Sequence, residues 1–247
     1  MTEKQGEIAL DLLPSLDGDL VSDPASLAAA ANDFGNIIHH TPKAILRPGS
    51  VNDIVKTMHY ARDNNLRIAI RGNGHTAYGQ SQADAGIVID ISTLNKIHSI
   101  TSDSAVVEAG VVWRDLLQAT LATDLTPPVL TDYTKLTVGG TLSVGGVSGR
   151  SYQLGAQVDN VLELEVVTGE GQIVTCSESK NKDLFEGVLA GLGLCAVIVR
   201  AMLRLIPAKK YARTHILLYP NASALLNDLQ LLVGDKRFDY LRGNGVA

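Results

Sequence analysis

The segment RGNGHTAYGQ, residues Arg71 to Gln80, carries most of the information about the fold of this chain. It lies between two apolar runs, Leu66 to Ile70 and Ile87 to Ile91, which are predicted to be buried β-strands. Glycines at positions 72 and 74 allow the backbone to turn tightly and to aim successive N–H groups at one point. Such a nest of N–H groups suits an anionic pyrophosphate, so we interpret the loop as a phosphate-binding turn.

The loop does not follow the Rossmann dinucleotide fingerprint. Its glycines at 72, 74 and 79 give the spacing GxGxxxxG instead of GxGxxG. In addition, no matching acidic residue follows about twenty positions later within a βαβ unit. A nicotinamide site of the Rossmann type is therefore not expected.

The segments around the loop alternate between strand and helix. Residues 44–46 form a short apolar strand, and Ser50 followed by Asp53 is typical of a capping box that opens a helix. That helix is predicted to end near Asn64. Its buried face carries Ile54, Val55, Met58 and Ala61 at helical spacing. The order strand, helix, strand, glycine-rich turn, strand predicts the α+β class.

The middle of the chain predicts a second group of strands. A strand over residues 105–112 leads into a helix over residues 113–122, and the stretch from 136 to 149 carries five glycines. The clearest β-hairpin joins residues 161–167 to residues 172–176 through the turn TGEG. Two further elements are expected: a helix capped by Asn181 or Asp183, and a long antiparallel strand from Ala196 to Ile206.

These patterns predict three regions. Residues 1–36 are expected to be a helical N-terminal appendage, with helical spacing at Ile8, Leu12 and Leu13 and a second helical patch at Leu27 to Ala31. Residues 37–210 form the main domain. Residues 211–247 are read as one strand, one helix and the start of another strand, which is too little to close a sheet or bury a core. We therefore expect them to begin a second domain that is incomplete.

Composition excludes several classes of function. The net charge is -5, and the 21 basic residues form no basic stripe, so nucleic acid is not an expected partner. No segment reaches the roughly 18 apolar residues of a membrane span, and no signal peptide is evident, so a cytoplasmic protein without membrane contact is expected. Two isolated cysteines, Cys176 and Cys195, suit neither a disulfide framework nor a zinc site. No metal is expected.

Residues 44–207 resemble the FAD-binding domain of the vanillyl-alcohol oxidase (PCMH-type) superfamily, and most of all the cytokinin dehydrogenases. This resemblance implies two α/β subdomains, one with a small parallel or mixed sheet and one with a larger antiparallel sheet with helices. It rests on RGNGHTAYGQSQADAGIVID from Arg71, TDYTKLTVGGTLSVGGVSGRSYQLGAQVDNVLELEVVTGEGQIVTCS from Thr131, and NKDLFEGVLAGLGLCAVIVRA from Asn181.

The resemblance also implies roles for individual residues. His75 matches the histidine whose Nδ1 is bonded to the 8α carbon of FAD, and Asp132 matches the carboxylate that handles the proton of the substrate amine. Desolvation in an apolar cleft would suit an acid to that role. A turn aspartate capping the loop from Thr134 to Thr137 is the alternative for Asp132. The remaining positions that match FAD-contacting residues are Gly72, Asn73, Gly74, Thr76, Gln80, Thr137, Ser143, Val147 and Val197.

The chain departs from the family pattern in two places. Leu194, Cys195 and Ala196 stand where many relatives have Gln-Phe-Gly, and Lys135 stands where an apolar residue is common. These departures put the details of the adenine pocket and of the cleft mouth in doubt, but they do not affect the expected fold.

The function implied by the resemblance is oxidation of a small-molecule secondary amine such as a cytokinin. FAD would take a hydride from the carbon next to nitrogen, and the imine would hydrolyse to adenine and an aldehyde, with a quinone or oxygen as final electron acceptor. Two alternatives remain open. One is oxidation of an alcohol, sugar or lactone on the same domain. The other is a flavin-binding module without turnover.

Overall fold

A four-stranded mixed sheet forms the N-terminal part of the protein, whose computed structural model describes residues 15 to 245. The strand order is β1-β2-β4-β3. Strand β1 (Asp19–Val21) is antiparallel to β2 (Ala44–Arg47). Strand β4 (Ile87–Asp90) lies in the centre and is parallel to both β2 and β3 (Ile68–Arg71). All three parallel strands therefore point their carboxyl ends to the same edge of the sheet.

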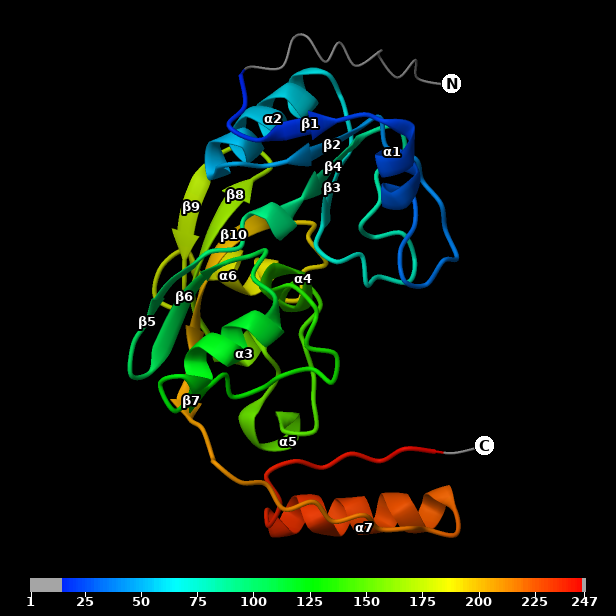
Figure 1. The fold of residues 1–247 in the computed structure, drawn as a ribbon, viewed down its shortest axis with the longest axis vertical. Coiled ribbons are helices and arrows are strands. Elements are labelled where there is room, and N and C mark those ends of the chain that lie inside the picture. Colours follow the sequence, from blue (N-terminus) through cyan, green and yellow to red (C-terminus); the bar gives the residue numbers. More distant parts are fainter. Residues whose placement is uncertain (1–14, 246–247) are drawn as a thin grey trace.

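Two helices accompany this sheet. Helix α2 (Val51–Asp63) connects β2 to β3 and lies along the sheet (Figure 1). Helix α1 (Pro24–Ala30) lies beside the same sheet and contacts β2. The Asp23 side chain caps α1 by accepting from the Ser26 N–H at 3.0 Å. The expected helical patch at Leu27 to Ala31 is thus present as α1.

A five-stranded antiparallel sheet forms the second part, with the order β5-β6-β10-β8-β9. Its strands are β5 (Ile97–Ile100), β6 (Ser104–Glu108), β8 (Val161–Thr168), β9 (Ile173–Cys176) and β10 (Ala196–Arg204). The predicted hairpin is the β8–β9 pair, with Val167 opposite Ile173. The predicted long strand is β10, which lies in the centre between β6 and β8. The two sheets match the α+β architecture that the resemblance implied.

The second part of the protein also contains short helices (Figure 1). They are α3 (Trp113–Leu121), α4 (Val138–Leu142), α5 (Ser151–Leu154) and α6 (Lys182–Val188), with 3₁₀ turns at Ile91–Thr93 and Val158–Asn160. A small two-stranded sheet pairs β7 (Leu125–Thr126) with β11 (Ile206–Pro207). The buried indole of Trp113 donates to Oγ1 of Thr141 at 2.7 Å, which joins α3 to α4 inside the core.

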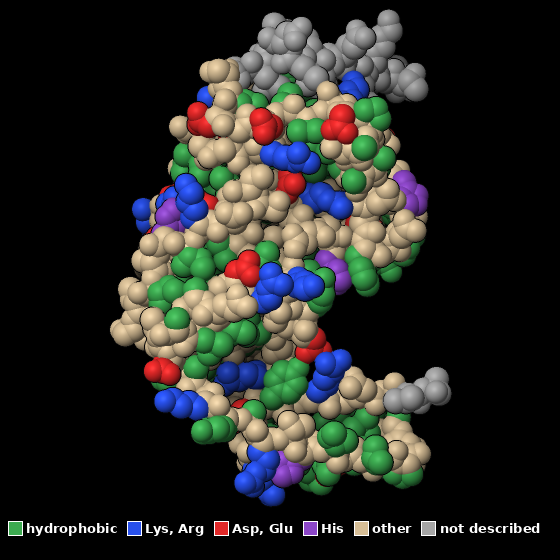
Figure 2. All heavy atoms as spheres, in the orientation of Figure 1, with side chains coloured by type: hydrophobic (Ala, Val, Ile, Leu, Met, Phe, Trp, Pro, Cys, Tyr) green, Lys and Arg blue, Asp and Glu red, His purple; other side chains and the backbone are tan. Residues whose placement is uncertain are grey.

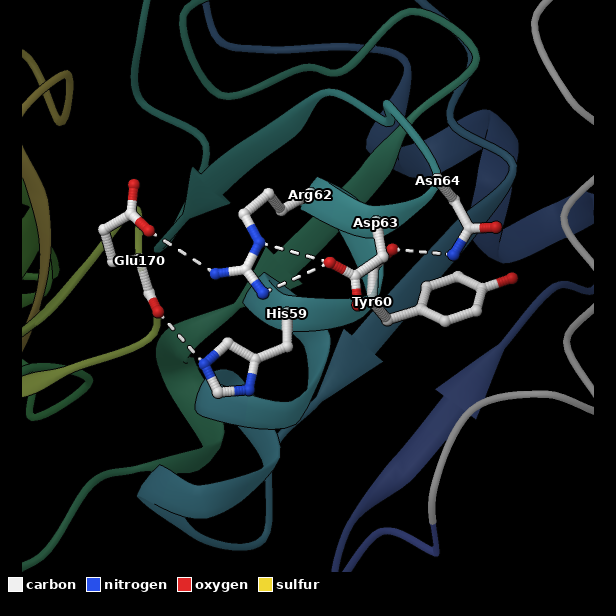
Figure 3. A network of polar contacts seen from close by, with 6 residues as sticks. All are labelled: His59, Tyr60, Arg62, Asp63, Asn64 and Glu170. Carbon is white, nitrogen blue, oxygen red and sulfur yellow. Dashed lines mark hydrogen bonds and ion pairs between the residues drawn. The ribbon is translucent and has the colours of Figure 1, made fainter.

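Contacts between α2 and the β8–β9 turn join the two parts of the protein (Figure 3). Nε2 of His59 lies 3.0 Å from the backbone oxygen of Glu170, and because a carbonyl only accepts, this ring nitrogen carries the hydrogen. Arg62 forms an ion pair with the Glu170 carboxylate at 3.4 Å. Gly171 adopts φ +75°, and a Cβ there would lie 2.2 Å from Nε2 of His59, so glycine is needed for this close approach.

The start of α2 differs from the predicted reciprocal capping box. Asp53 is fully buried and accepts from the N–H groups of Asp17, Gly18 and Gly49, each at 2.9 Å. Ser50 makes no side-chain cap, because its hydroxyl donates to Asp17 at 2.7 Å. Burial alone would raise the pKa of Asp53, but these backbone donors outweigh it and hold the pKa below the usual value. The carboxylate therefore joins β1, β2 and α2.

Both ends of the chain differ from the expected secondary structure. The predicted helix at Ile8, Leu12 and Leu13 lies outside the described residues, but Asp19–Val21 forms strand β1 where a helical appendage was expected. Residues 214–220 contain no strand, since their backbone has no neighbouring strand to pair with in the described chain. Helix α7 (Ala222–Asp235) follows and lies apart from both sheets (Figure 1). The three domain boundaries stay predictions.

A search of residues 15 to 245 for membrane-spanning helices found none that is long and apolar enough. The same residues contain no cluster of three or more His, Cys, Asp or Glu side chains that could hold a metal ion.

Candidate functional site

The glycine-rich loop begins where β3 ends, at the carboxyl edge of the parallel strands. This is the edge at which open sheets with parallel strands bind ligands. Gly74 has φ +63° and Gly79 has φ +75°, a region that side chains strain to reach. A Cβ at Gly74 would lie 2.4 Å from Nη2 of Arg71, so the Arg71 guanidinium packs directly beneath the turn. It donates to the Asn32 carbonyl at 2.7 Å, which fixes it there.

The loop offers unused backbone donors. Within residues 15 to 245, the backbone N–H groups of Asn73, Gly74, His75 and Thr76 donate to no protein acceptor. Four consecutive N–H groups around a left-handed glycine form the kind of concave donor set that binds anions. The use of these groups to bind a pyrophosphate stays a prediction.

A second glycine-rich segment, residues 137 to 149, lies against the first. A Cβ at Gly72 would lie 2.2 Å from Oγ1 of Thr137, and the side-chain amide of Asn73 donates to the Lys135 carbonyl. Thr137 is buried and caps α4 by accepting from the Gly140 N–H at 3.3 Å. The structure thus brings the predicted residues Gly72, Asn73 and Thr137 together.

Residues 33–35, which the sequence did not point to, hold the glycine-rich loop by hydrogen bonds. The Asp33 carboxylate is buried and accepts from the Gly79 N–H at 2.8 Å, the Thr76 hydroxyl at 2.9 Å and the Asn36 N–H at 3.1 Å. Burial would raise the pKa of Asp33, but these donors together lower it. The backbone N–H groups of Phe34 and Gly35 donate to the carbonyls of residues 74 and 76 at 2.8 and 3.0 Å. The only sequence signal was an acidic residue after a helix, which is too common to be informative.

The imidazole of His75 lies between two aromatic rings. The Phe34 ring centroid is 4.1 Å away with an interplanar angle of 34°, and the Tyr133 centroid is 5.1 Å away at 21°. In the described part of the chain, neither ring nitrogen of His75 has a hydrogen-bond partner. The imidazole is exposed, so its nitrogens are accessible from solvent.

Asp132 meets the segment that follows α7. The Tyr240 hydroxyl donates to Oδ1, and an Arg242 nitrogen lies 3.0 Å from Oδ2. Residues 238–242 are held against residues 149–153, since the Leu241 N–H donates to the Gly149 carbonyl at 2.9 Å and the Tyr152 hydroxyl donates to the Phe238 carbonyl. The surface is hollowed between this segment and the main body (Figure 2).

The contacts of Asp132 have two consequences. Its carboxylate accepts no capping bond from residues 134–137 among the described residues, so the turn-capping alternative lacks support. The hydrogen bond to Asp132, aided by burial and by the carboxylate's charge, raises the pKa of Tyr240 above its usual value.

The remaining predicted residues are Gln80, Ser143, Val147 and Val197, and their side chains range from buried to exposed. Oε1 of Gln80 accepts from the Tyr78 N–H at 3.0 Å, and the Ser143 hydroxyl donates to the Gly139 carbonyl at 2.8 Å. The Val147 side chain is 72% exposed, whereas Val197 is 2% exposed within β10. The Val197 side chain is therefore a core residue, and only its backbone could reach a ligand.

Known proteins share much of this sequence. Residues 42–177 match the family described as FAD binding domain. An uncharacterized oxidoreductase (ORF5 in the fasciation locus) of Rhodococcoides fascians is 44% identical over 90% of this chain and 51% of its own length. Cytokinin dehydrogenase 9 of Oryza sativa subsp. japonica is 42% identical over 88% of this chain and 43% of its own length.

A solved structure shows the same fold. The crystal structure of 6-hydroxy-D-nicotine oxidase from Arthrobacter nicotinovorans superimposes with a TM-score of 0.72 at 29% identity, covering 78% of this chain and 43% of the other. The chain spans about half the length of the curated relatives it matches.

Proposed function

The chain belongs to the FAD binding domain family, and from this premise we propose that it holds FAD covalently through His75 and oxidises a secondary amine of the cytokinin type. The observation that carries the proposal is the set of free backbone N–H groups at residues 73–76 around the exposed His75 imidazole, whose ring lies 5.1 Å from that of Tyr133, the residue next to Asp132. The similarity to cytokinin dehydrogenases supports the choice of substrate.

The residues present suit the pyrophosphate of FAD. The four unpartnered N–H groups can donate to its oxygens, and the absence of a side chain at Gly72 allows the two glycine-rich segments to approach each other. FAD, when bound, supplies the two-electron acceptor for the oxidation. The protein supplies the orientation of the cofactor and the contacts to the substrate.

His75 is proposed to form the covalent link. The bond joins an imidazole nitrogen to the 8α carbon of the cofactor and replaces one N–H bond and one C–H bond. The two protons and two electrons removed would pass to dioxygen, which becomes hydrogen peroxide. The free nitrogens and the exposed position of the imidazole support this role.

Asp132 is proposed to bind the amine N–H of the substrate and to accept its proton. The hydrogen on the carbon next to nitrogen leaves as hydride, and water then adds to the imine, which releases an adenine-type amine and an aldehyde. Because Tyr240 and Arg242 already contact both oxygens of Asp132, a substrate must share or replace one of these contacts.

The experiment is the intact mass of the purified chain together with flavin fluorescence on a denaturing gel. Wild type is expected to carry the added mass of FAD and to fluoresce, whereas His75→Ala is expected to lose both. An unfluorescent wild type, or a fluorescent His75→Ala, contradicts the link. Turnover of isopentenyladenine, compared with that of alcohols, sugars and lactones, tests the substrate class.

The role of Asp132 needs a separate variant. Asp132→Asn keeps the size of the side chain and removes its charge, so it is expected to retain FAD and to lose substrate-dependent reduction of the flavin by about 10²–10⁴-fold. Asp115→Asn is the matched control, since Asp115 is also half-exposed and paired with an arginine. Equal turnover in all three proteins contradicts the role.

A further inference from the structure

We propose that Phe34 and Tyr133 are positioning residues that hold the imidazole of His75 by its two faces and present its nitrogen-bearing edge to the carbon with which it bonds. This inference rests on the proposed link between His75 and FAD. It adds two residues whose function would be to speed formation of that link, and neither needs to contact the phosphates.

Both rings pack on the faces of the imidazole. The interplanar angles of 34° and 21° are those of tilted or stacked rings, and not of edge-on contacts. No ring contact joins Phe34 to Tyr133 in residues 15 to 245, although each lies close to His75. The two rings therefore contact the imidazole separately.

The two aromatic residues are fixed to the loop on either side of His75. The Phe34 N–H donates to the carbonyl of Gly74, and the next residue, Gly35, donates to the carbonyl of Thr76. A Cβ at Gly35 would lie 2.3 Å from the backbone oxygen of Ala77, so only glycine allows this approach. Near Tyr133, the Lys135 carbonyl accepts from the Asn73 amide. The segments that carry the two rings are thus held by hydrogen bonds to residues on either side of the histidine.

The rings remain exposed in spite of their size. Phe34 is 71% exposed and Tyr133 is 48% exposed, so neither ring contributes much to the core. Among the described residues, the ring that each of them contacts is the imidazole of His75. Because both rings contact the imidazole while its nitrogens lack partners, the nitrogen-bearing edge of the ring is left free to react. This supports a function in orienting His75.

The consequence is a kinetic one. Without one of the rings, the imidazole can rotate away from the reactive geometry, although the donors for the pyrophosphate are unchanged. Loss of one aromatic pair corresponds to about a three- to tenfold change in rate. The affinity for FAD should remain within about twofold, because the N–H groups of residues 73–76 do not depend on either ring.

The test measures linkage and binding separately. Chain produced under riboflavin limitation is mixed with saturating FAD, and covalent flavin is followed by fluorescence after denaturation. Noncovalent affinity is measured on a His75→Ala background by quenching of FAD fluorescence. Phe34→Ala and Tyr133→Ala are each expected to link about three- to tenfold more slowly with unchanged affinity. Phe34→Tyr and Tyr133→Phe are expected to restore the rate.

Tyr78→Ala is the matched control. Tyr78 lies in the same loop, is 65% exposed and has no ring contact with His75 among the described residues, so its removal should leave the rate unchanged. A second measurement needs no flavin: the ring protons of His75 should show aromatic ring-current shifts in NMR spectra of wild type. These shifts should shrink in Phe34→Ala and Tyr133→Ala.

The failures of the two proposals are distinguishable. Wild-type linkage rates in Phe34→Ala and Tyr133→Ala overturn the positioning role and leave the link intact. A parallel loss of FAD affinity and thermal stability also overturns it, because the rings would then be structural. A wild type that never links flavin overturns the link itself. If Phe34→Ala fails to fold, Phe34→Leu replaces the ring with a side chain of similar hydrophobicity.

Discussion

The hydroxyl of Tyr240 donates to Oδ1 of Asp132 at 2.5 Å, so two residues far apart in the sequence meet at the proposed catalytic carboxylate. The Arg242 guanidinium contacts the other oxygen at 3.0 Å. Both side chains of this ion pair are about half exposed, and exposed pairs contribute about 0–1 kcal/mol. A substrate amine could therefore replace either contact at small cost.

The first prediction concerns the ionisation of Tyr240. The hydrogen bond to Asp132 and the negative charge of the carboxylate disfavour the phenolate and raise the pKa of Tyr240. Asp132→Asn removes the charge, so the pKa of Tyr240 should fall towards that of free tyrosine. A pH titration followed by NMR of labelled tyrosines measures this, with Tyr240→Phe identifying the signal. An unchanged titration in Asp132→Asn would show that the two residues do not interact.

The second prediction concerns the contact between the two glycine-rich segments. Gly72→Ala places a methyl group 2.2 Å from Oγ1 of Thr137, so it should lower the free energy of unfolding by about 1–3 kcal/mol and weaken FAD binding at least tenfold. Gly169→Ala is the control, because a Cβ there has open space. Thermal unfolding and FAD titration measure both effects.

A double mutant locates the clash. Thr137→Ala alone loses the cap of α4, which is worth about 1 kcal/mol. In combination with it, Gly72→Ala should cost less than it does alone, since the opposing oxygen is gone. Strict additivity of the two substitutions would contradict direct contact between the segments.

The third prediction concerns the pH dependence of stability at Asp33. The folded pKa of this carboxyl lies below its unfolded value of about 3.8, so its contribution is complete at neutral pH and is lost as the pH falls below that value. Asp33→Asn should lower the melting temperature at pH 7 and flatten its decline between pH 5 and pH 3. Parallel curves for both proteins would show that Asp33 is not coupled to folding.

The fourth prediction separates strain from clash at the junction of the two sheets. Gly171→Ala introduces both an unfavourable φ and a methyl group 2.2 Å from His59, whereas Gly193→Ala, at φ +74°, introduces only the unfavourable φ. Gly193→Ala should cost about 1–2 kcal/mol and Gly171→Ala clearly more, measured by denaturant unfolding. Equal costs would show that the packing of His59 on the turn contributes little.

The sequence predicted those strands and helices in which apolar residues alternate or recur at helical spacing. The β8–β9 hairpin followed from two apolar runs around TGEG, and α2 from apolar residues at helical spacing. The strands β1 and β5 were missed. Strand β1 has three residues, and β5 alternates weakly, so each is defined by its partner strand and not by its own sequence.

The candidate site was predictable only in part. Glycines that need a left-handed φ or a close approach are visible in a sequence, and this identified Gly72 and Gly74. The contacts of Asp33, Phe34 and Tyr240 are not visible, since each joins residues that are distant in the chain and of common types. The strand expected after residue 213 was wrong for a related reason: among residues 15 to 245, the exposed apolar residues there pair with no strand.

The hydrogen bonds that join Asp33, Phe34 and Gly35 to the glycine-rich loop set a limit on how the flavin module can be exchanged between enzymes. The part of the chain that matches the FAD binding domain family is residues 42–177, so these three residues lie before it. A chimera joined at residue 42 would contain the glycine-rich loop but would lack residues 33–35, whose hydrogen bonds hold the loop in its conformation. The junction of such a chimera should therefore lie before Asp33, so that the loop and the residues that hold it come from the same protein.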